Sequence, residues 1–179
     1  MATRSVQIFS PQRVERMLNR MAYEVIERNR GAGNLLVIGI KRKGVAIAQA
    51  IAARIEAAEG VSLPVTSLDV ASFRDDREEV VRGEENLPPI EVTGKDILLV
   101  DDVLFTGRTV RAALDAIVQF GRPRTIQLAV LIDRGHREYP IQPDYVGRRL
   151  VTKYREHVQV ETTPPFRVYL VEPLLVSAS

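Results

Sequence analysis

Residues 97–109 combine two acids, two threonines and a glycine in a spacing that suits the binding of a phosphorylated sugar. An apolar run ends in the adjacent acids Asp101 and Asp102, and residues 106–109 (Thr-Gly-Arg-Thr) then begin a predicted helix. Backbone N–H groups at a helix N-terminus bind phosphate, and threonine hydroxyls add further donors. Carboxylate oxygens suit sugar hydroxyls or a Mg²⁺ shell. The alternative is a plain strand–helix turn capped by an aspartate.

A basic segment, Lys41-Arg42-Lys43-Gly44, follows a continuous apolar run at residues 35–40. Three neighbouring cations usually form a solvated turn, which is the alternative interpretation here. Their position directly after a buried strand favours a functional role, because positive charge stabilises a leaving group that becomes negative in the transition state. The chain contains no GxxxxGK[ST] motif, so a P-loop nucleotide site is excluded.

The elements that must position these segments alternate between strand and helix. A first helix is predicted from Pro11, with Ser10 as its N-cap, because the apolar residues from Val14 to Ile26 recur at helical spacing. Apolar runs predict strands at residues 35–40, 65–70, 97–103 and 125–132, and further helices are predicted at residues 45–58 and 108–120. This alternation is typical of an α/β fold with a doubly wound, mostly parallel sheet and helices on both faces. Ligands bind at the carboxyl ends of the strands in such a sheet.

Length and composition fit a single domain, residues 1–179, since 45% hydrophobic and 27% charged residues exclude a disordered or fibrous chain. Residues 133–179 are expected to form most of a small β-rich hood, from short strand-like pieces at Tyr145–Val146, Val158–Val160 and Val168–Val171. The absence of cysteine excludes disulfides and cysteine nucleophiles. No apolar run reaches the ~20 residues of a membrane span, and no signal peptide is evident, so we expect a cytoplasmic protein without membrane contact.

The segment 97–109 resembles the signature of the type I phosphoribosyltransferases, which bind 5-phosphoribosyl-1-pyrophosphate (PRPP). The resemblance implies that Asp101 and Asp102 hold the ribose hydroxyls as catalytic residues, that residues 106–109 bind the 5-phosphate, and that the basic segment binds pyrophosphate. Mg²⁺ is expected to accompany PRPP and to be held mainly by its oxygens, with no direct protein ligand. Arg74 lies in a long polar loop that is expected to close over PRPP. The complete predicted PRPP and UMP site comprises Lys41, Arg42, Lys43, Gly44, Arg74, Asp101, Asp102, Val103, Leu104, Phe105, Thr106, Gly107, Arg108 and Thr109.

Three further segments, residues 39–41, 72–76 and 131–141, are similar to the PyrR family. That family comprises RNA-binding attenuators of pyrimidine operons that also have uracil phosphoribosyltransferase activity. The resemblance implies a protein that converts uracil and PRPP to UMP and pyrophosphate, and that binds UMP or UTP and the leader mRNA of a pyrimidine operon. It also implies that uracil binds near Arg134 and the backbone of Val158. The apolar helices allow a homodimer or homotetramer, which is the assembly we expect.

Two alternatives remain open beside this hypothesis. Phe105 stands where purine-salvaging relatives carry a third acid, and it cannot accept a proton, which argues against a purine or other nucleobase salvage enzyme without an RNA role. A regulator that has lost catalysis is the other alternative, against which the intact acid pair argues. His136 is either a general base or, as we favour, a hydrogen-bonded structural residue.

Two stretches carry an excess of positive charge that suits RNA. Residues 1–30 hold six arginines against three glutamates, and residues 134–155 hold six basic residues against two acids. A solvated basic face is the alternative explanation. Amide, guanidinium and aromatic side chains can bind base edges, phosphates and unpaired bases, respectively. The positions that match the RNA-binding face of the PyrR family are Asn19, Arg20 and Tyr23. From the second basic stretch, Arg148, Arg149 and Lys153 are also expected to bind RNA.

Overall fold

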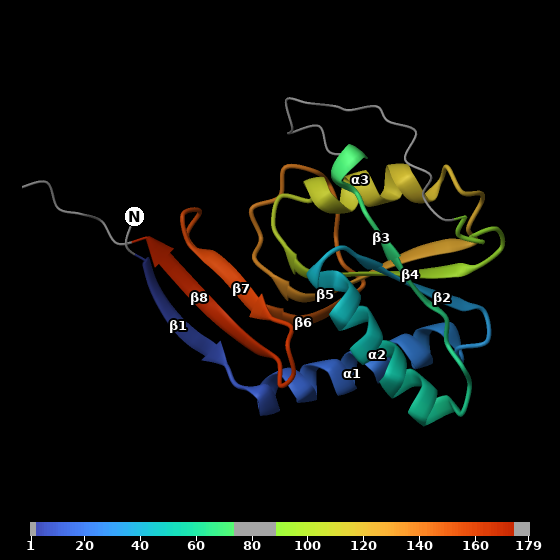
Figure 1. Cartoon of the computed structure of the whole chain (residues 1–179), viewed down its shortest axis with the longest axis horizontal. Helices are drawn as coiled ribbons and strands as arrows, with labels where there is room; N and C mark the ends of the chain where they lie inside the picture. Colours follow the sequence, from blue (N-terminus) through green and yellow to red (C-terminus); the bar gives the residue numbers. More distant parts are fainter. Residues whose placement is uncertain (1–2, 74–88, 174–179) are drawn as a thin grey trace, which may run out of the picture.

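The main body is built on a five-stranded parallel sheet with the strand order β3-β2-β4-β5-β6 (Figure 1). The computed structural model describes residues 3–73 and 89–173. The strands are β2 (Leu35–Ile40), β3 (Val65–Leu68), β4 (Asp96–Leu104), β5 (Thr125–Asp133) and β6 (Tyr145–Arg149). The predicted doubly wound parallel sheet is therefore confirmed. All six residues of β2 are buried, as expected for an inner strand covered on both faces.

Three helices cover the two faces of this sheet (Figure 1). The buried residues of α1 (Pro11–Asn29) and α2 (Lys43–Glu59) pack in one apolar cluster, and those of α3 (Arg108–Ile117) pack in a second. The N-terminus of α1 is capped as predicted, since the Ser10 side chain accepts a hydrogen bond from the Arg13 amide. The second helix begins two residues earlier than predicted, at Lys43, so that half of the basic segment is helical.

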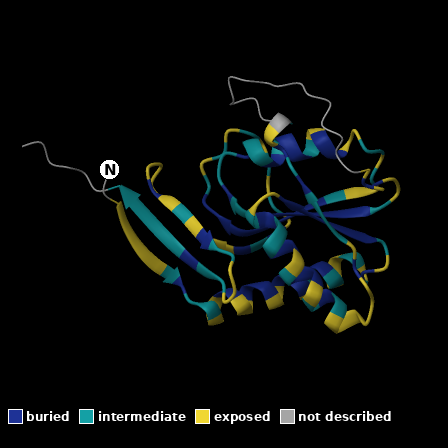
Figure 2. Cartoon of the chain, in the orientation of Figure 1, coloured by how far each residue is buried: buried dark blue, intermediate teal, exposed yellow. Residues whose placement is uncertain are grey.

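A second, antiparallel sheet stands beside the main body, and we call it the hood sheet (Figure 1). It consists of β1 (Thr3–Phe9), β8 (Arg167–Pro173) and β7 (His157–Glu161), in that order. Figure 2 shows that much of it is exposed or half-buried, whereas the main sheet is mostly buried. The sheet joins the main body through Phe9, Val160 and Val168, which are buried in the apolar cluster that contains α1.

Two strands differ from the prediction. Strand β1 was not predicted from the sequence, and Tyr145–Val146, which were predicted to belong to the hood, begin β6 of the main sheet. Tyr145 and Val146 lie opposite Ala129 and Val130 of β5 in parallel register. An edge strand needs only one neighbour, so a short piece with few apolar residues suffices. The short helix η1 (Ala71–Phe73) follows β3 directly.

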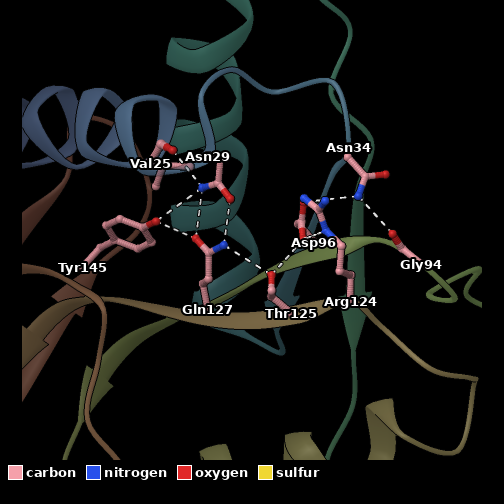
Figure 3. Close-up of polar contacts among 9 residues, drawn as sticks. All are labelled: Val25, Asn29, Asn34, Gly94, Asp96, Arg124, Thr125, Gln127 and Tyr145. Carbon is pink, nitrogen blue, oxygen red and sulfur yellow. Dashed lines mark hydrogen bonds and ion pairs between the residues drawn. The ribbon is translucent and has the colours of Figure 1, made fainter.

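A network of polar side chains ties α1 to the edge of the main sheet where the strands begin (Figure 3). Asn29, near the end of α1, donates to Gln127 at 3.0 Å and accepts a hydrogen bond from it at 2.7 Å. The Tyr145 hydroxyl donates to the same Gln127 side chain at 2.5 Å. Beside them, Asp96 accepts hydrogen bonds from the Nε of Arg124 at 2.8 Å and from the hydroxyl of Thr125 at 2.9 Å. The network fixes the edge opposite the predicted site.

No helix within residues 3–73 and 89–173 has the length and apolar character that crossing a bilayer requires.

Candidate active site

The acid pair lies near the carboxyl end of β4, the central strand of the main sheet. Asp101 is buried and lies opposite Val130 of β5, and its Oδ1 accepts a hydrogen bond from the Asp102 amide at 2.9 Å. Asp102 is half-buried. Both acids lie inside the strand, as predicted, and β4 continues to pair with β5 as far as Leu104.

The basic segment packs directly against the first of these acids. A Cβ at Gly44 would lie 2.5 Å from the Val100 carbonyl oxygen and 3.3 Å from Oδ1 of Asp101, so no larger residue fits between α2 and β4. Lys41 and Arg42 are exposed beside this contact. The fold therefore brings the predicted pyrophosphate segment and the predicted ribose-binding acids together, although Gly44 and Val100 are 56 positions apart in the sequence.

The predicted phosphate turn forms the start of α3. Gly107 is the N-cap residue of this helix and has a φ of 92°, a left-handed conformation that favours glycine. The carbonyl of Thr106 accepts hydrogen bonds from the amides of Glu138 at 2.8 Å and Tyr139 at 3.2 Å. Glu138 also pairs with the guanidinium of Arg108 at 2.6 Å. The segment after β5 thus fixes the turn, and the helix start is preformed for an anion.

Phe105 is part of a cluster of aromatic rings with a buried arginine. The Arg134 guanidinium carbon lies 4.0 Å from the centroid of the Phe105 ring. The rings of His136 and Tyr154 lie 5.5 Å and 5.4 Å from the same ring. Phe105 therefore packs against residues that follow β5 and β6.

Arg134 joins this cluster to the segment that leads into the hood. Its Nε donates to the Thr152 hydroxyl at 3.0 Å, and its Nη2 donates to the Glu156 carbonyl. Burial lowers the pKa of this guanidinium from its ordinary value. Val158 follows two residues later and is half-buried in β7. Arg134 and Val158 thus lie at the same end of the molecule, but the side chain of Arg134 already has internal hydrogen-bond partners.

His136 also hydrogen-bonds within this region. Its Nε2 lies 2.6 Å from the Thr152 carbonyl oxygen, which can only accept a hydrogen bond, so Nε2 carries the proton. His136 has a φ of 60°. This geometry favours the structural interpretation of His136. Arg74, predicted to bind PRPP, lies outside the described residues.

The predicted RNA-binding residues fall into two places. Arg20 on α1 donates to the carbonyl oxygens of Val146 at 3.0 Å and Gly147 at 2.6 Å on β6, next to Arg148. Asn19 accepts a hydrogen bond from Arg54 of α2 at 2.7 Å, and Tyr23 is 65% exposed. Lys153 instead lies beside the hood, where its Nζ is 3.4 Å from Glu156 and 3.8 Å from Glu172.

The structure also brings Arg13 and Arg16 beside Arg20 and Arg148, a grouping that was not predicted from the sequence. The spacing of Arg13, Arg16 and Arg20 along the predicted helix was the available signal, since residues three and four apart share a helix face.

Comparison with known proteins gives the family. The phosphoribosyl transferase domain family matches residues 5–164. A protein named bifunctional protein PyrR from Pelotomaculum thermopropionicum is 53% identical over 165 residues, which cover 89% of this chain and 90% of that protein. A second, from Deinococcus radiodurans, is 49% identical over 157 residues, with 86% of each chain covered. The chain belongs to the PyrR family of phosphoribosyltransferases. The resemblance identified from the sequence is thus confirmed.

Solved structures agree with this PyrR assignment at the level of the fold. A hypoxanthine phosphoribosyltransferase from Staphylococcus aureus has a TM-score of 0.67 at 18% identity and covers 83% of this chain and 79% of its own. A hypoxanthine-guanine phosphoribosyltransferase from Bacillus anthracis has a TM-score of 0.67 at 14% identity and covers 86% and 87%. At such identities the likeness shows a shared phosphoribosyltransferase fold and carries no information about the base.

Proposed function

We propose that this PyrR-family chain is a uridine-nucleotide-dependent RNA-binding regulator of pyrimidine biosynthesis genes that also has uracil phosphoribosyltransferase activity. The observation that carries the proposal is the close packing of Gly44 against Asp101, which puts basic residues and acids at one edge of the parallel sheet. Relatives that are about half identical over most of the chain carry the name bifunctional protein PyrR. The substrates are uracil and PRPP, and the products are UMP and pyrophosphate.

The reaction transfers the phosphoribosyl group from pyrophosphate to a ring nitrogen of uracil. Asp101 and Asp102 accept hydrogen bonds from the ribose hydroxyls and stabilise the positive charge that develops at the anomeric carbon. The turn at residues 106–109 holds the 5-phosphate, while Lys41, Arg42 and Lys43 stabilise the departing pyrophosphate. Uracil binds between the Phe105–Arg134 region and the backbone near Val158. Catalysis is mainly by positioning and electrostatics.

The donor set of this site fits Mg²⁺ that arrives with PRPP. Among the described residues no group of three or more histidine and acidic side chains could hold a metal ion, whereas Asp101 and Asp102 provide carboxylates beside the phosphate turn. Magnesium at phosphate sites is usually held by one or two carboxylates and by the substrate's own oxygens. When bound, the ion neutralises the charge of pyrophosphate.

The enzyme half is tested by incubating the protein with PRPP, Mg²⁺ and one base at a time. We expect pyrophosphate release with uracil and a much slower release with hypoxanthine or guanine. The Phe105 ring, stacked under Arg134, offers a purine no proton acceptor. Turnover with a purine but not with uracil would contradict the proposal and would favour a salvage enzyme.

The regulatory half depends on the surface formed by α1 and β6. Leader mRNA of a pyrimidine operon binds there through Asn19, Arg20, Tyr23, Arg148 and Arg149, and Lys153 extends the contact toward the hood. UMP or UTP in the active site favours this binding.

We further propose that residues 1–179 act as one cytoplasmic domain that assembles into a homodimer or homotetramer. The core shared by the hood sheet and α1 supports a single domain. Size-exclusion chromatography with light scattering tests the assembly.

A further inference from the structure

A short segment after β5 holds the phosphate turn from outside, and we call this segment, residues 137–139, the brace. The main-chain amides of Glu138 and Tyr139 both donate to the carbonyl oxygen of Thr106, at 2.8 Å and 3.2 Å. A Cβ placed on Gly107 would lie 3.4 Å from the Cβ of Tyr139, so the brace also packs against the next residue of the turn. The conformation of the turn therefore depends on a segment about 30 residues later in the chain.

Arg137 fixes the brace itself to the main body. Its Nη2 donates to the carboxylate of Asp133, the last residue of β5, at 2.7 Å. Its Nη1 donates to the carbonyl oxygen of Phe105 at 3.0 Å, and its Nε donates to that of Ile141 at 2.8 Å. Because all three guanidinium nitrogens bond groups of the protein, the brace is a fixed support for the turn.

Glu138 adds a side-chain contact to these main-chain bonds. Its Oε2 accepts hydrogen bonds from two nitrogens of Arg108, from Nε at 2.8 Å and from Nη2 at 2.6 Å. The guanidinium carbon of Arg108 also lies 5.5 Å from the centroid of the Tyr139 ring. Arg108 is the first residue of α3, so a contact that holds its side chain also holds the start of the helix.

We propose that Glu138 is a positioning residue for the 5-phosphate of PRPP and UMP. Its pair with Arg108 keeps the turn in the conformation in which main-chain amides and threonine hydroxyls bind the phosphate. The side chain of Arg108 connects the turn to the brace. This inference rests on the proposed phosphoribosyltransferase function and adds to it a residue that lies outside the phosphate turn.

Removing the charge of Glu138 has two possible effects of opposite sign, which makes the proposal testable. A carboxylate near a bound phosphate repels it, so charge alone predicts that Glu138→Gln binds UMP more tightly than wild type. Loss of a positioning contact instead leaves a turn that must be ordered when the ligand binds, which weakens binding. We expect the Kd of UMP to rise about fivefold, the scale of a partly exposed ion pair.

Ligands that reach different parts of the site separate the phosphate turn from the rest. UMP and ribose 5-phosphate carry the 5-phosphate, whereas uracil and pyrophosphate do not. For Glu138→Gln we expect the Kd of UMP, measured by calorimetry, and the inhibition constant of ribose 5-phosphate against PRPP to rise by the same factor. The KM of uracil and the inhibition constant of pyrophosphate should stay within about twofold of wild type. A general loosening of the site would weaken all four.

Asp115→Asn is the matched control. Asp115 is an exposed acid on α3 that pairs with Arg111 of the same helix at 3.5 Å, and its loss changes the net charge equally. We expect this variant to leave the affinity for UMP and for ribose 5-phosphate within about twofold of wild type. Melting temperatures verify that both variants are folded.

A double-mutant cycle tests whether Arg108 acts through Glu138. Arg108→Gln should weaken UMP binding at least as much as Glu138→Gln does. The variant with both substitutions should bind UMP no more weakly than Arg108→Gln alone, because the two substitutions remove the same contact. If the two losses instead add, each residue acts on the phosphate independently, and the proposed pairing is wrong.

The possible failures are distinguishable. If the wild-type protein binds neither UMP nor PRPP, the proposed function fails and this inference fails with it. If wild type forms and binds UMP but Glu138→Gln binds UMP equally well or more tightly, only the inference is overturned. It is also overturned if uracil and pyrophosphate are affected as strongly as UMP, because Glu138 then supports the whole site and not the phosphate turn.

Discussion

Asp101 and Asp102 are adjacent in the sequence but have different surroundings. Asp101 is buried against Gly44, whereas Asp102 is half-buried. Replacing Asp102 with asparagine keeps its volume and should leave the fold unchanged. We expect turnover of uracil and PRPP to fall about 100-fold or more, because a neutral amide cannot stabilise the developing positive charge. Pyrophosphate release by Asp102→Asn at the wild-type rate would contradict the catalytic role.

His136 provides a second prediction at the scale of single residues. Its φ of 60° and its bond to the Thr152 carbonyl are both compatible with asparagine, which tolerates a left-handed conformation and can donate through its amide. If His136 is structural, His136→Asn keeps turnover within a few-fold of wild type and leaves the pH–rate profile unchanged. Loss of a general base would instead cost about 10²- to 10⁴-fold and remove one limb of the profile.

The acid pair, the phosphate turn and the basic segment could be predicted from the sequence alone. Each of them lies at the end of an apolar run that predicts a parallel strand, and the carboxyl ends of parallel strands meet at one edge of the sheet. The side-chain contacts around these residues could not be predicted from the sequence. Phe105 meets Arg134, and Arg134 in turn meets Glu156, only through the packing of segments that follow β5 and β6. Such contacts depend on side-chain rotamers and loop paths, which local residue patterns do not specify.

Among whole elements, the inner strands could be predicted from the sequence and the exposed strand β1 could not. The inner strands β2, β4 and β5 were predictable because long apolar runs mark strands buried on both faces. The exposed strand β1 is polar along most of its length and forms by pairing with β8, more than 150 residues later in the chain. Because β1 forms by pairing with so distant a strand, its local sequence has no clear strand pattern.

The edge network of Asp96 gives a prediction about the pH dependence of stability. The hydrogen bond from Arg124 holds the pKa of Asp96 at about 2, below its ordinary value of 3.8. A carboxylate whose pKa is lowered by folding stabilises the native state above its unfolded pKa, and this stabilisation is lost as the pH falls through the folded pKa. We therefore expect Asp96→Asn to be less stable than wild type at pH 7, with the difference closing between about pH 4 and pH 2.

Urea unfolding of both proteins at a series of pH values measures this difference. The control is Asp115→Asn, which removes an exposed acid paired within α3 at 3.5 Å and should change stability little at any pH. A constant difference between Asp96→Asn and wild type from pH 7 to pH 2 would mean that the charge of Asp96 does not contribute to stability.

At the scale of the whole molecule, a continuous set of contacts connects the active site to the proposed RNA surface. Phe105, in the segment after the acid pair, packs under Arg134, which bonds Thr152 and Glu156. These two residues belong to the segment that directly follows β6, the strand that carries Arg148. A ligand that shifts Phe105 can therefore alter the position of β6 relative to α1.

This connection predicts that UMP and RNA bind with positive coupling. If UMP prefers the RNA-binding conformation, saturating UMP should raise RNA affinity by about 5- to 150-fold, the usual range of coupling between two sites. Thermodynamic linkage then requires RNA to raise UMP affinity by the same factor. Filter binding of RNA with and without UMP, and calorimetric titration of UMP with and without RNA, measure the two factors independently. Equal RNA affinity in the presence and absence of UMP would contradict this prediction, because UMP in the active site would then not regulate RNA binding.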